Sequence, residues 1–370
     1  MSNKLPALQP GAKISAYSIG TLGPLALTQK GDILVTMTSH QVGSLKKGAT
    51  LFLLPKKIPI GGLVKKYKIK YIKKTRRKIK NSSTLLSHKL APYDSSLRIK
   101  GIEDDLPIVL KKPIEPEINR TLIKSGASTG VTQGKVLDVS KEVTVEFSDG
   151  SVAKFSDQIM SEYMGTHGDS GSFVLTADTF EPVGLLFAGN QQVAFHNKLT
   201  NVAKLMDFRG FFCPISLPPN TPPELRFIIS TIIPDGFFIQ KTNLLNRDPD
   251  IILKELGIGE IRKKSTGGFE VFYEGAILTS NSHKIGDEGS FLFTEKRQVI
   301  GLAVGGNEQA TVAIKIDKIL RALNLELITS FTKSSLVFVH KSGYWRTRCK
   351  TCDATIAPGS KCSFCGSVAN

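Results

Sequence analysis

The chain has 370 residues, which exceeds one average domain and predicts two or three folded units. Its 41% hydrophobic and 22% charged residues place it among ordinary globular proteins that bury cores. No run of about 18 apolar residues is present, which excludes a transmembrane helix. The N-terminus lacks the apolar core of a secretory signal, so we expect a cytoplasmic protein with no membrane partner.

A basic tract near the N-terminus supplies much of the formal net charge of +17. Twelve Lys or Arg residues and no acid stand between Lys56 and Lys80. Such a tract attracts nucleic acid or acidic proteins by Coulomb steering. Residues 66–71 alternate polar and apolar side chains, which is typical of the solvated face of a strand. The strand face is the favoured interpretation, and a nucleic-acid surface is the alternative.

Most of the chain has the pattern of β-structure. Short alternating or β-branched runs recur between Gly, Asp and Asn turns, as at residues 33–36, 143–147 and 173–175. Many short strands at this spacing are typical of barrels or sandwiches. Helical periodicity is clear in three segments, at residues 201–207, 248–256 and 317–325.

A repeat flanks the Pro-rich segment 215–226, which predicts a linker. Residues from Gly168 to Met206 match those from Gly286 to Leu320 in order and spacing. This match over about forty residues indicates duplication of one structural unit. The copies begin Gly-Asp-Ser-Gly-Ser-Phe and Gly-Asp-Glu-Gly-Ser-Phe, so Ser170 of the first copy is Glu288 in the second.

The Gly168–Ser172 motif has what a nucleophilic serine requires. A serine hydroxyl is weakly reactive until a base removes its proton and donors stabilise the oxyanion. The glycines on either side of Ser170 let the backbone fold tightly and aim amide groups at one point. In that geometry the amides of Gly168 and Ser170 form the oxyanion hole.

Gly168–Asn190 resembles the active-serine region of trypsin-like serine peptidases, particularly their bacterial intracellular-type branch. Ile33–Val42 resembles the strand and turn that deliver the catalytic histidine. Ala91–Ile99 resembles the segment that carries the aspartate, and Lys124–Val136 resembles the run that opens the second barrel. The resemblance spans residues 16–208 and keeps the family's His, Asp, Ser chain order.

The resemblance implies a catalytic triad of His40, Asp94 and Ser170. His40 is the general base, and Asp94 holds the imidazole in the required tautomer. Asp104 and Asp105 are alternatives to Asp94. The segment departs from the family around His40, which follows Thr-Ser and precedes Gln41, where a small or apolar residue is commoner.

The resemblance also indicates a substrate pocket. Met164 lies six residues before the nucleophile, at the base of the pocket, and the wall strand is Phe187, Ala188 and Gly189. Because an apolar floor cannot neutralise a buried Lys or Arg, we expect an apolar or small residue in the substrate at this position.

Asp169 bears on activation. Secreted members of the family pair this aspartate with an N-terminus freed by zymogen cleavage, and no Ile-Val-Gly-Gly-like start precedes the first strand here. A buried carboxylate needs a partner, so we expect another group to supply it. Activity is then controlled by another route, such as a regulatory protein partner or the C-terminal domains. In the second copy, Glu288 is no acyl-transfer nucleophile and His283 matches no part of the His40 region, so that copy predicts a degenerate barrel.

The C-terminal cysteines predict a structural zinc site. Cys349, Cys352, Cys362 and Cys365 form two Cys-x2-Cys knuckles in the last 22 residues, the spacing that tetrahedral Zn²⁺ needs. Four thiolates leave no open position for catalysis, and the segment resembles a zinc ribbon that docks nucleic acid or protein. Cys213, next to Pro214, is interpreted as a buried small hydrophobic residue.

Together these features predict an all-β protein: a chymotrypsin-like double β-barrel, a degenerate second-barrel-like domain and a zinc ribbon. The expected boundaries are 1–115, 116–212, 213–331 and 332–370. The predicted function is a regulated serine endopeptidase acting on protein or peptide substrates, with no cofactor besides structural Zn²⁺. The alternatives are a catalytically silent protease-fold protein that binds nucleic acid or protein, and an esterase. A role in antiviral defence would suit an intracellular protease with appended sensor-like domains.

Overall fold

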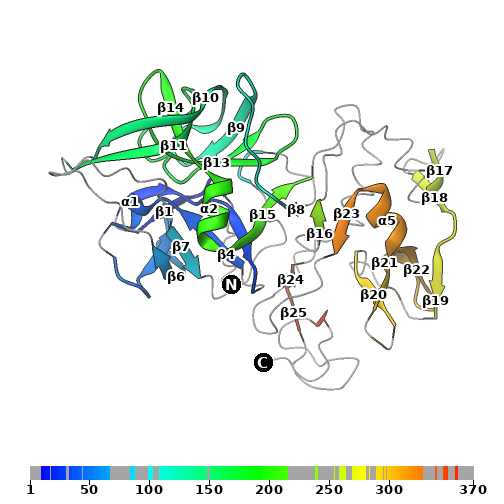
Figure 1. Cartoon of the computed structure of the whole chain (residues 1–370). Helices are drawn as coiled ribbons and strands as arrows, with labels where there is room; N and C mark the ends of the chain where they lie inside the picture. The colour runs from blue at the N-terminus through cyan, green and yellow to red at the C-terminus, as the bar shows by residue number, and fades with distance from the viewer. Residues whose placement is uncertain are drawn as a thin grey trace.

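The structure of the protein is a computed structural model. It describes residues 10–16, 18–30, 33–43, 45–66, 84–87, 99–102, 108–147, 151–215, 238–240, 254, 258–263, 269–280, 283, 289–294, 296, 298–327, 338–339, 345–348 and 355–356. Strands predominate throughout these residues, which confirms the all-β class (Figure 1). No helix in the described ranges is long and apolar enough to cross a membrane.

Strands from residues 13–111, together with three strands from later in the chain, form a sheet of eleven strands, here called the large sheet. Its strands, in spatial order, are β2 (Ile19–Thr21), β1 (Lys13–Ser15), β5 (Thr50–Leu53), β6 (Ile58–Lys66), β7 (Thr84–Ser87), β4 (Ile33–Met37), β3 (Leu25–Thr28), β15 (Phe208–Pro214), β8 (Ile108–Lys111), β16 (Phe238–Gln240) and β23 (Leu325–Leu327). Alternating burial along β5 (Leu51 and Leu53 inward, Thr50 and Phe52 outward) shows why these residues form a half-buried strand. The inward side chains of this region, including Ile14, Val35 and Met37, form one apolar core.

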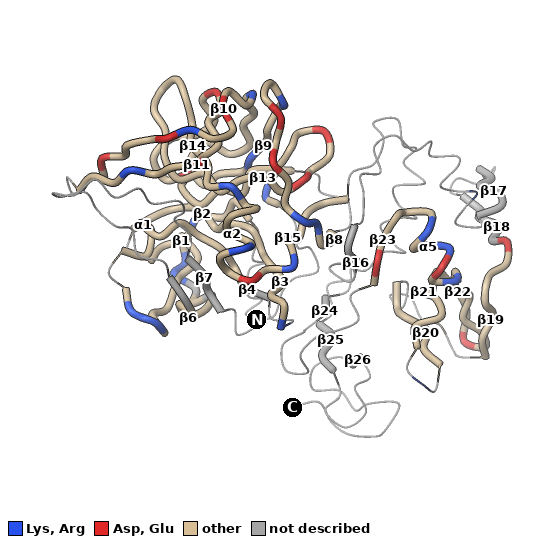
Figure 2. The backbone as a smooth tube through the Cα atoms, in the orientation of Figure 1, with Lys and Arg blue, Asp and Glu red and all other residues tan. Residues whose placement is uncertain are grey.

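The middle of the chain forms a closed six-stranded barrel, here called the barrel. Its strands, in spatial order, are β10 (Gly130–Glu146), β11 (Val152–Glu162), β14 (Val193–Lys198), β13 (Pro182–Gly189), β12 (Phe173–Thr176) and β9 (Thr121–Gly126). Residues 143–147, expected as a short strand, are the end of the long β10–β11 hairpin. Lys residues and acidic residues both lie along this hairpin, as in the Lys154–Glu142 pair at 2.8 Å (Figure 2).

Residues 277–322 include a four-stranded sheet and one helix, here called the repeat unit. It comprises β19 (Ile277–Thr279), β22 (Thr311–Lys315), β21 (Val299–Gly306), β20 (Phe291–Phe293) and α5 (Ile316–Ala322). Two smaller sheets pair β17 (Ile258–Lys263) with β18 (Phe269–Tyr273), and β24 (Phe338–Val339) with β25 (Trp345–Arg348) and β26 (Thr355–Ile356).

The repeat unit has the strand register of the corresponding part of the barrel. Phe173 pairs with Leu185 in the barrel, and Phe291 pairs with Leu302 in the repeat unit. The β13–β14 hairpin of the barrel has a register shift between Leu186 and Ala188, and the β21–β22 hairpin of the repeat unit has one between Ala303 and Gly305. A short helix follows each hairpin, α2 (Leu199–Met206) in the barrel and α5 in the repeat unit. The helices predicted at 201–207 and 317–325 therefore exist, but the second ends early because Leu325 begins β23. The helix predicted at 248–256 lies outside the described residues except for Lys254.

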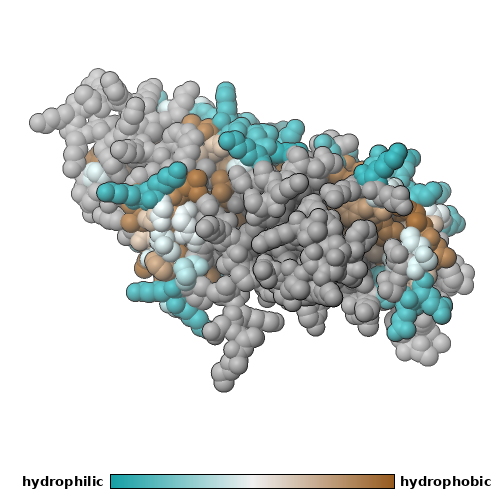
Figure 3. All heavy atoms as spheres, turned by 90° about the horizontal axis from the view of Figure 1, so that it is seen from below, coloured by the Kyte–Doolittle hydropathy of each residue, from teal (hydrophilic) through white to brown (hydrophobic). Residues whose placement is uncertain are grey.

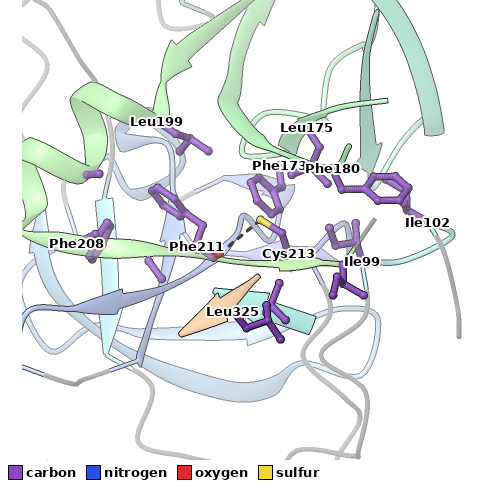
Figure 4. Close-up of a cluster of buried hydrophobic side chains, with 14 of the residues drawn as sticks. Ile99, Ile102, Phe173, Leu175, Phe180, Leu199, Phe208, Phe211, Cys213 and Leu325 are labelled. Carbon is purple, nitrogen blue, oxygen red and sulfur yellow. Dashed lines mark hydrogen bonds between the residues drawn. The ribbon is translucent and has the colours of Figure 1, made fainter. Parts of the chain in front are cut away.

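One apolar cluster joins the barrel, the large sheet and the repeat unit (Figure 4). Phe173 of β12 and Phe211 of β15 lie with their ring centroids 6.4 Å apart. Leu325 of β23 belongs to the same buried cluster. This shared core packs the repeat unit against the barrel and the large sheet.

Candidate active site

The loop around Ser170 has an alternating pattern of used and unused backbone donors. The N–H groups of Asp169, Gly171 and Ser172 donate to Thr166, Leu186 and Asp169, at 3.0, 2.8 and 2.9 Å. Within the described part of the chain, the N–H groups of Gly168 and Ser170 donate to no protein acceptor. Gly168 and Gly171 have φ of 97° and 95°, the left-handed region that favours glycine. The loop therefore leaves free the two amides expected to form the oxyanion hole.

The Ser170 hydroxyl is half-buried beside the first residue of the expected pocket wall. Its Oγ donates weakly to the carbonyl of Phe187, at 3.5 Å. The Ser170 carbonyl accepts from the N–H of Thr21 in β2, at 2.9 Å. The Ser170 loop, residues 168–172, thus spans the boundary between the barrel and the large sheet.

His40 lies on α1 (Ser39–Val42), a single helical turn that follows β4. The sequence predicted a strand followed by a turn here. Thr38 and Gln41 form a capping box that stabilises the turn. The neighbouring Gln41 side chain donates to the Ser170 carbonyl, which places α1 against the Ser170 loop.

The surroundings of the His40 imidazole favour its neutral form. The ring is half-buried, with its centroid 5.7 Å from that of Phe147, which follows β10. Burial, with the nearby His167, lowers the pKa of His40 to about 4. Its Nδ1 atom is buried and has no hydrogen-bond partner among the described residues. A buried polar atom of this kind calls for a partner.

The three carboxylates considered for that partner, Asp94, Asp104 and Asp105, all lie outside the described residues. The third member of the predicted triad therefore stays a prediction.

Asp169 has the substitute partner that the sequence predicted. Its carboxylate is fully buried and lies 3.3 Å from Nζ of the equally buried Lys124 on β9. It also accepts from the N–H groups of Ser128 and Thr166, at 2.8 and 3.0 Å, and from Oγ1 of Thr129, at 2.7 Å. Burial opposes ionisation, but these hydrogen bonds and the Lys124 charge lower the pKa of Asp169 overall. A cation from within the chain thus lies beside the buried carboxylate of the Ser170 loop.

The residues expected to form the substrate pocket fall into two apolar clusters. Met164 is fully buried in the core of the barrel with Ile159, Val174 and Leu186. Phe187 packs in a second cluster against Phe155, with ring centroids 4.8 Å apart, and Ala188 lies beside it. Gly189 pairs with Ala194 at the end of β13. The role of these four residues in substrate binding stays a prediction.

The sequence did not predict three residues that contact His40 or the Ser170 loop. Gln41 stood out only as a departure from the family pattern. Lys124 was noticed only as the start of a glycine-rich run, although the need of Asp169 for a cation was a usable signal. Phe147 gave no signal, because nothing local predicts that a long hairpin reaches the His40 ring.

Of the five cysteines, the structure describes only Cys213. Cys213 is fully buried in the shared core, which confirms the interpretation of a small hydrophobic residue, and burial raises the pKa of its thiol. Cys349, Cys352, Cys362 and Cys365 lie outside the described residues, and β25 ends directly before the first of them.

No protein-family model and no curated protein match this chain. Among solved structures, it is similar to protease A of Thermobifida fusca, with 13% identity over 55% of this chain and 98% of that one and a TM-score of 0.41. A glutamic acid-specific serine protease is 16% identical over 56% of this chain and all of that one, with a TM-score of 0.40. A Nocardiopsis protease is 12% identical over 57% of this chain and all of that one, with a TM-score of 0.39.

Proposed function

We propose that this chain is a serine endopeptidase that hydrolyses peptide bonds through an acyl-enzyme. Ser170 is the nucleophile and His40 the general base. The observation that carries the proposal is the pair of unused amides at Gly168 and Ser170, next to a half-buried hydroxyl. Two convergent N–H donors are the arrangement that stabilises the oxyanion of a tetrahedral intermediate.

The proposed reaction follows from these groups. Neutral His40 takes the Ser170 proton as Oγ attacks the scissile carbonyl, and the amides of Gly168 and Ser170 hold the resulting oxyanion. The imidazolium then protonates the leaving amine. In the second half of the reaction, His40 takes a proton from water as the water attacks the acyl-enzyme ester, and returns it to Oγ of Ser170 as the acid product leaves. Asp94 is proposed to accept a hydrogen bond from the Nδ1–H of His40, which would satisfy the buried Nδ1 atom.

The proposed substrate is a protein or peptide with an apolar or small residue before the scissile bond. The aromatic cluster of Phe155 and Phe187 supports an apolar environment next to Ser170, whose Oγ donates to the Phe187 carbonyl. A charged side chain placed there would lose its hydration without a counter-charge.

The C-terminal segment is proposed to be a zinc ribbon held by Cys349, Cys352, Cys362 and Cys365. Four thiolates at this spacing fit tetrahedral Zn²⁺, which would stabilise a segment too short for an apolar core. Reduced thiols accord with the proposed cytoplasmic location. We expect one zinc ion per chain by elemental analysis and none in Cys349→Ser/Cys352→Ser, with full metal content in a Cys213→Ala control.

Active-site labelling with a fluorophosphonate tests the protease proposal. The reagent phosphonylates only a serine whose proton a base removes, so we expect labelling of the wild type and none of Ser170→Ala or His40→Ala. Ser172→Ala is the matched control, because Ser172 lies in the same loop but its hydroxyl is buried and bonded to the Asp169 carbonyl at 2.6 Å. Labelling that survives Ser170→Ala, or an unreactive wild type, contradicts the proposal.

A further inference from the structure

We propose that Gln41 is a positioning residue that holds the His40 helix against the backbone of Ser170. The inference rests on the proposed function and adds to it a residue that joins the two halves of the site. Gln41 follows His40 directly and its side chain is fully buried.

Both ends of the Gln41 amide are engaged. Its Nε2 donates to the Ser170 carbonyl at 2.5 Å, and its Oε1 accepts from the N–H and the hydroxyl of Thr38, each at 2.9 Å. A backbone N–H only donates and a carbonyl only accepts, so these two partners together fix the orientation of the amide. The contact spans 129 positions in sequence.

The backbone around the amide leaves room for it because two neighbouring residues are glycines. A Cβ at Gly20 of β2 would overlap Nε2 of Gln41, and one at Gly171 would lie 2.9 Å from Oε1 and 3.0 Å from Nε2. The main-chain carbonyl of Gln41 accepts from the N–H of Ser18, at 3.1 Å. Two glycines thus form a slot for the amide between the large sheet and the Ser170 loop.

This slot matters because α1 has only four residues. One isolated helical turn is not stable by itself, so its position depends on its contacts. The Ser170 carbonyl has two donors from the N-terminal part, Gln41 and Thr21. Fixing that carbonyl fixes the direction of the Ser170 side chain relative to His40, and catalysis is sensitive to displacements of about 1 Å between such groups.

Gln41→Met and Gln41→Glu separate volume from hydrogen bonding. Gln41→Met keeps the volume and removes all three hydrogen bonds of the side-chain amide. Gln41→Glu keeps the shape, but its ionised carboxylate has no donor for the Ser170 carbonyl. We expect the fluorophosphonate labelling rate and the kcat for a peptide substrate to fall about ten- to hundredfold in both variants at neutral pH, with KM within about threefold. Gln298→Met, at an exposed position of the repeat unit, is the control and should match the wild type.

The pH dependence of Gln41→Glu tests the hydrogen bond itself. A protonated carboxyl donates one hydrogen bond and accepts another, as the amide does, so the rate of the variant relative to the wild type should rise as pH falls. A role limited to packing would leave that ratio constant. A ratio independent of pH, or wild-type rates in Gln41→Met, overturns the inference. An unreactive wild type instead contradicts the proposed function.

Discussion

The barrel loop that carries Ser170 and the repeat-unit loop at Gly289 share a local structure. The N–H of Gly171 donates to the Leu186 carbonyl at 2.8 Å, and that of Gly289 donates to the Ala303 carbonyl at 2.7 Å. Both glycines have positive φ, 95° and 81°. The two glycines therefore share a hydrogen bond to the neighbouring strand and a backbone conformation, whereas residues 284–288 lie outside the described residues.

The surroundings of the two loops differ. The first lies in a closed barrel, against α1 and above the Lys124–Asp169 pair. The second belongs to an open four-stranded sheet, at whose end of the molecule apolar surface is visible (Figure 3), with Leu278 71% and Phe293 56% exposed. We infer that the repeated residues determine the local conformation of each loop, whereas the proposed chemistry depends on side chains from other elements that contact the first loop.

The largest expected effect is on the nucleophile. Ser170→Ala should reduce peptide hydrolysis by at least about a thousandfold, as removal of a triad member does. Glu288→Ser in the Ser170→Ala background restores the serine of the motif in the second copy only. We expect no labelling of that double variant by mass spectrometry, because no base segment precedes the second copy. A phosphonylated peptide containing position 288 would show that the second copy can also activate a serine.

Removal of the cation beneath the first loop should come next. Lys124→Met leaves Asp169 buried without a counter-charge, which should cost about 3–5 kcal/mol in the free energy of unfolding measured in urea. Because the pKa of Asp169 is lowered in the folded state, this carboxylate stabilises the wild type above the ordinary carboxyl pKa, and that contribution is lost as pH falls. Lys124→Met/Asp169→Asn should recover most of the stability at neutral pH. Equal stability of Lys124→Met and wild type would show that the pair contributes nothing.

The pH profile identifies the carboxylate that the first copy uses. The described surroundings lower the pKa of His40 to about 4, and a carboxylate at Nδ1 would raise it. The acid limb of kcat/KM should therefore lie at lower pH in Asp94→Asn than in the wild type, with a lower plateau. If the limb does not move, Asp94 is not the partner, and the same measurement on Asp104→Asn and Asp105→Asn decides between the alternatives.

The smallest effect is expected on the open face of the repeat unit. Leu278→Ser and Phe293→Ser remove mostly exposed surface and should change the free energy of unfolding by less than about 0.5 kcal/mol. Leu302→Ala, in the shared core and fully buried, should cost about 2–5 kcal/mol. Costs above about 1 kcal/mol at the exposed positions would mean that another surface covers this face in solution.

Local pattern predicted the elements well and their extent poorly. The strand at residues 33–36 and the helix near 201–207 were found because alternation and helical periodicity are properties of neighbouring residues. The β10–β11 hairpin was underestimated because its alternation is broken by register shifts, and its contact with His40 depends on how the hairpin bends. The triad carboxylate and the zinc cysteines stay predictions.

The sequence by itself determined the all-β class, the repeated loop and the need of Asp169 for a partner, since each follows from residue types at fixed spacing or from the cost of burying a charge. The tertiary structure decided that Lys124 is that partner and that Gln41 joins α1 to the Ser170 carbonyl. Both contacts link residues 45 and 129 positions apart. No local propensity encodes such pairings, because the first depends on how the barrel closes and the second on how the large sheet packs against the barrel.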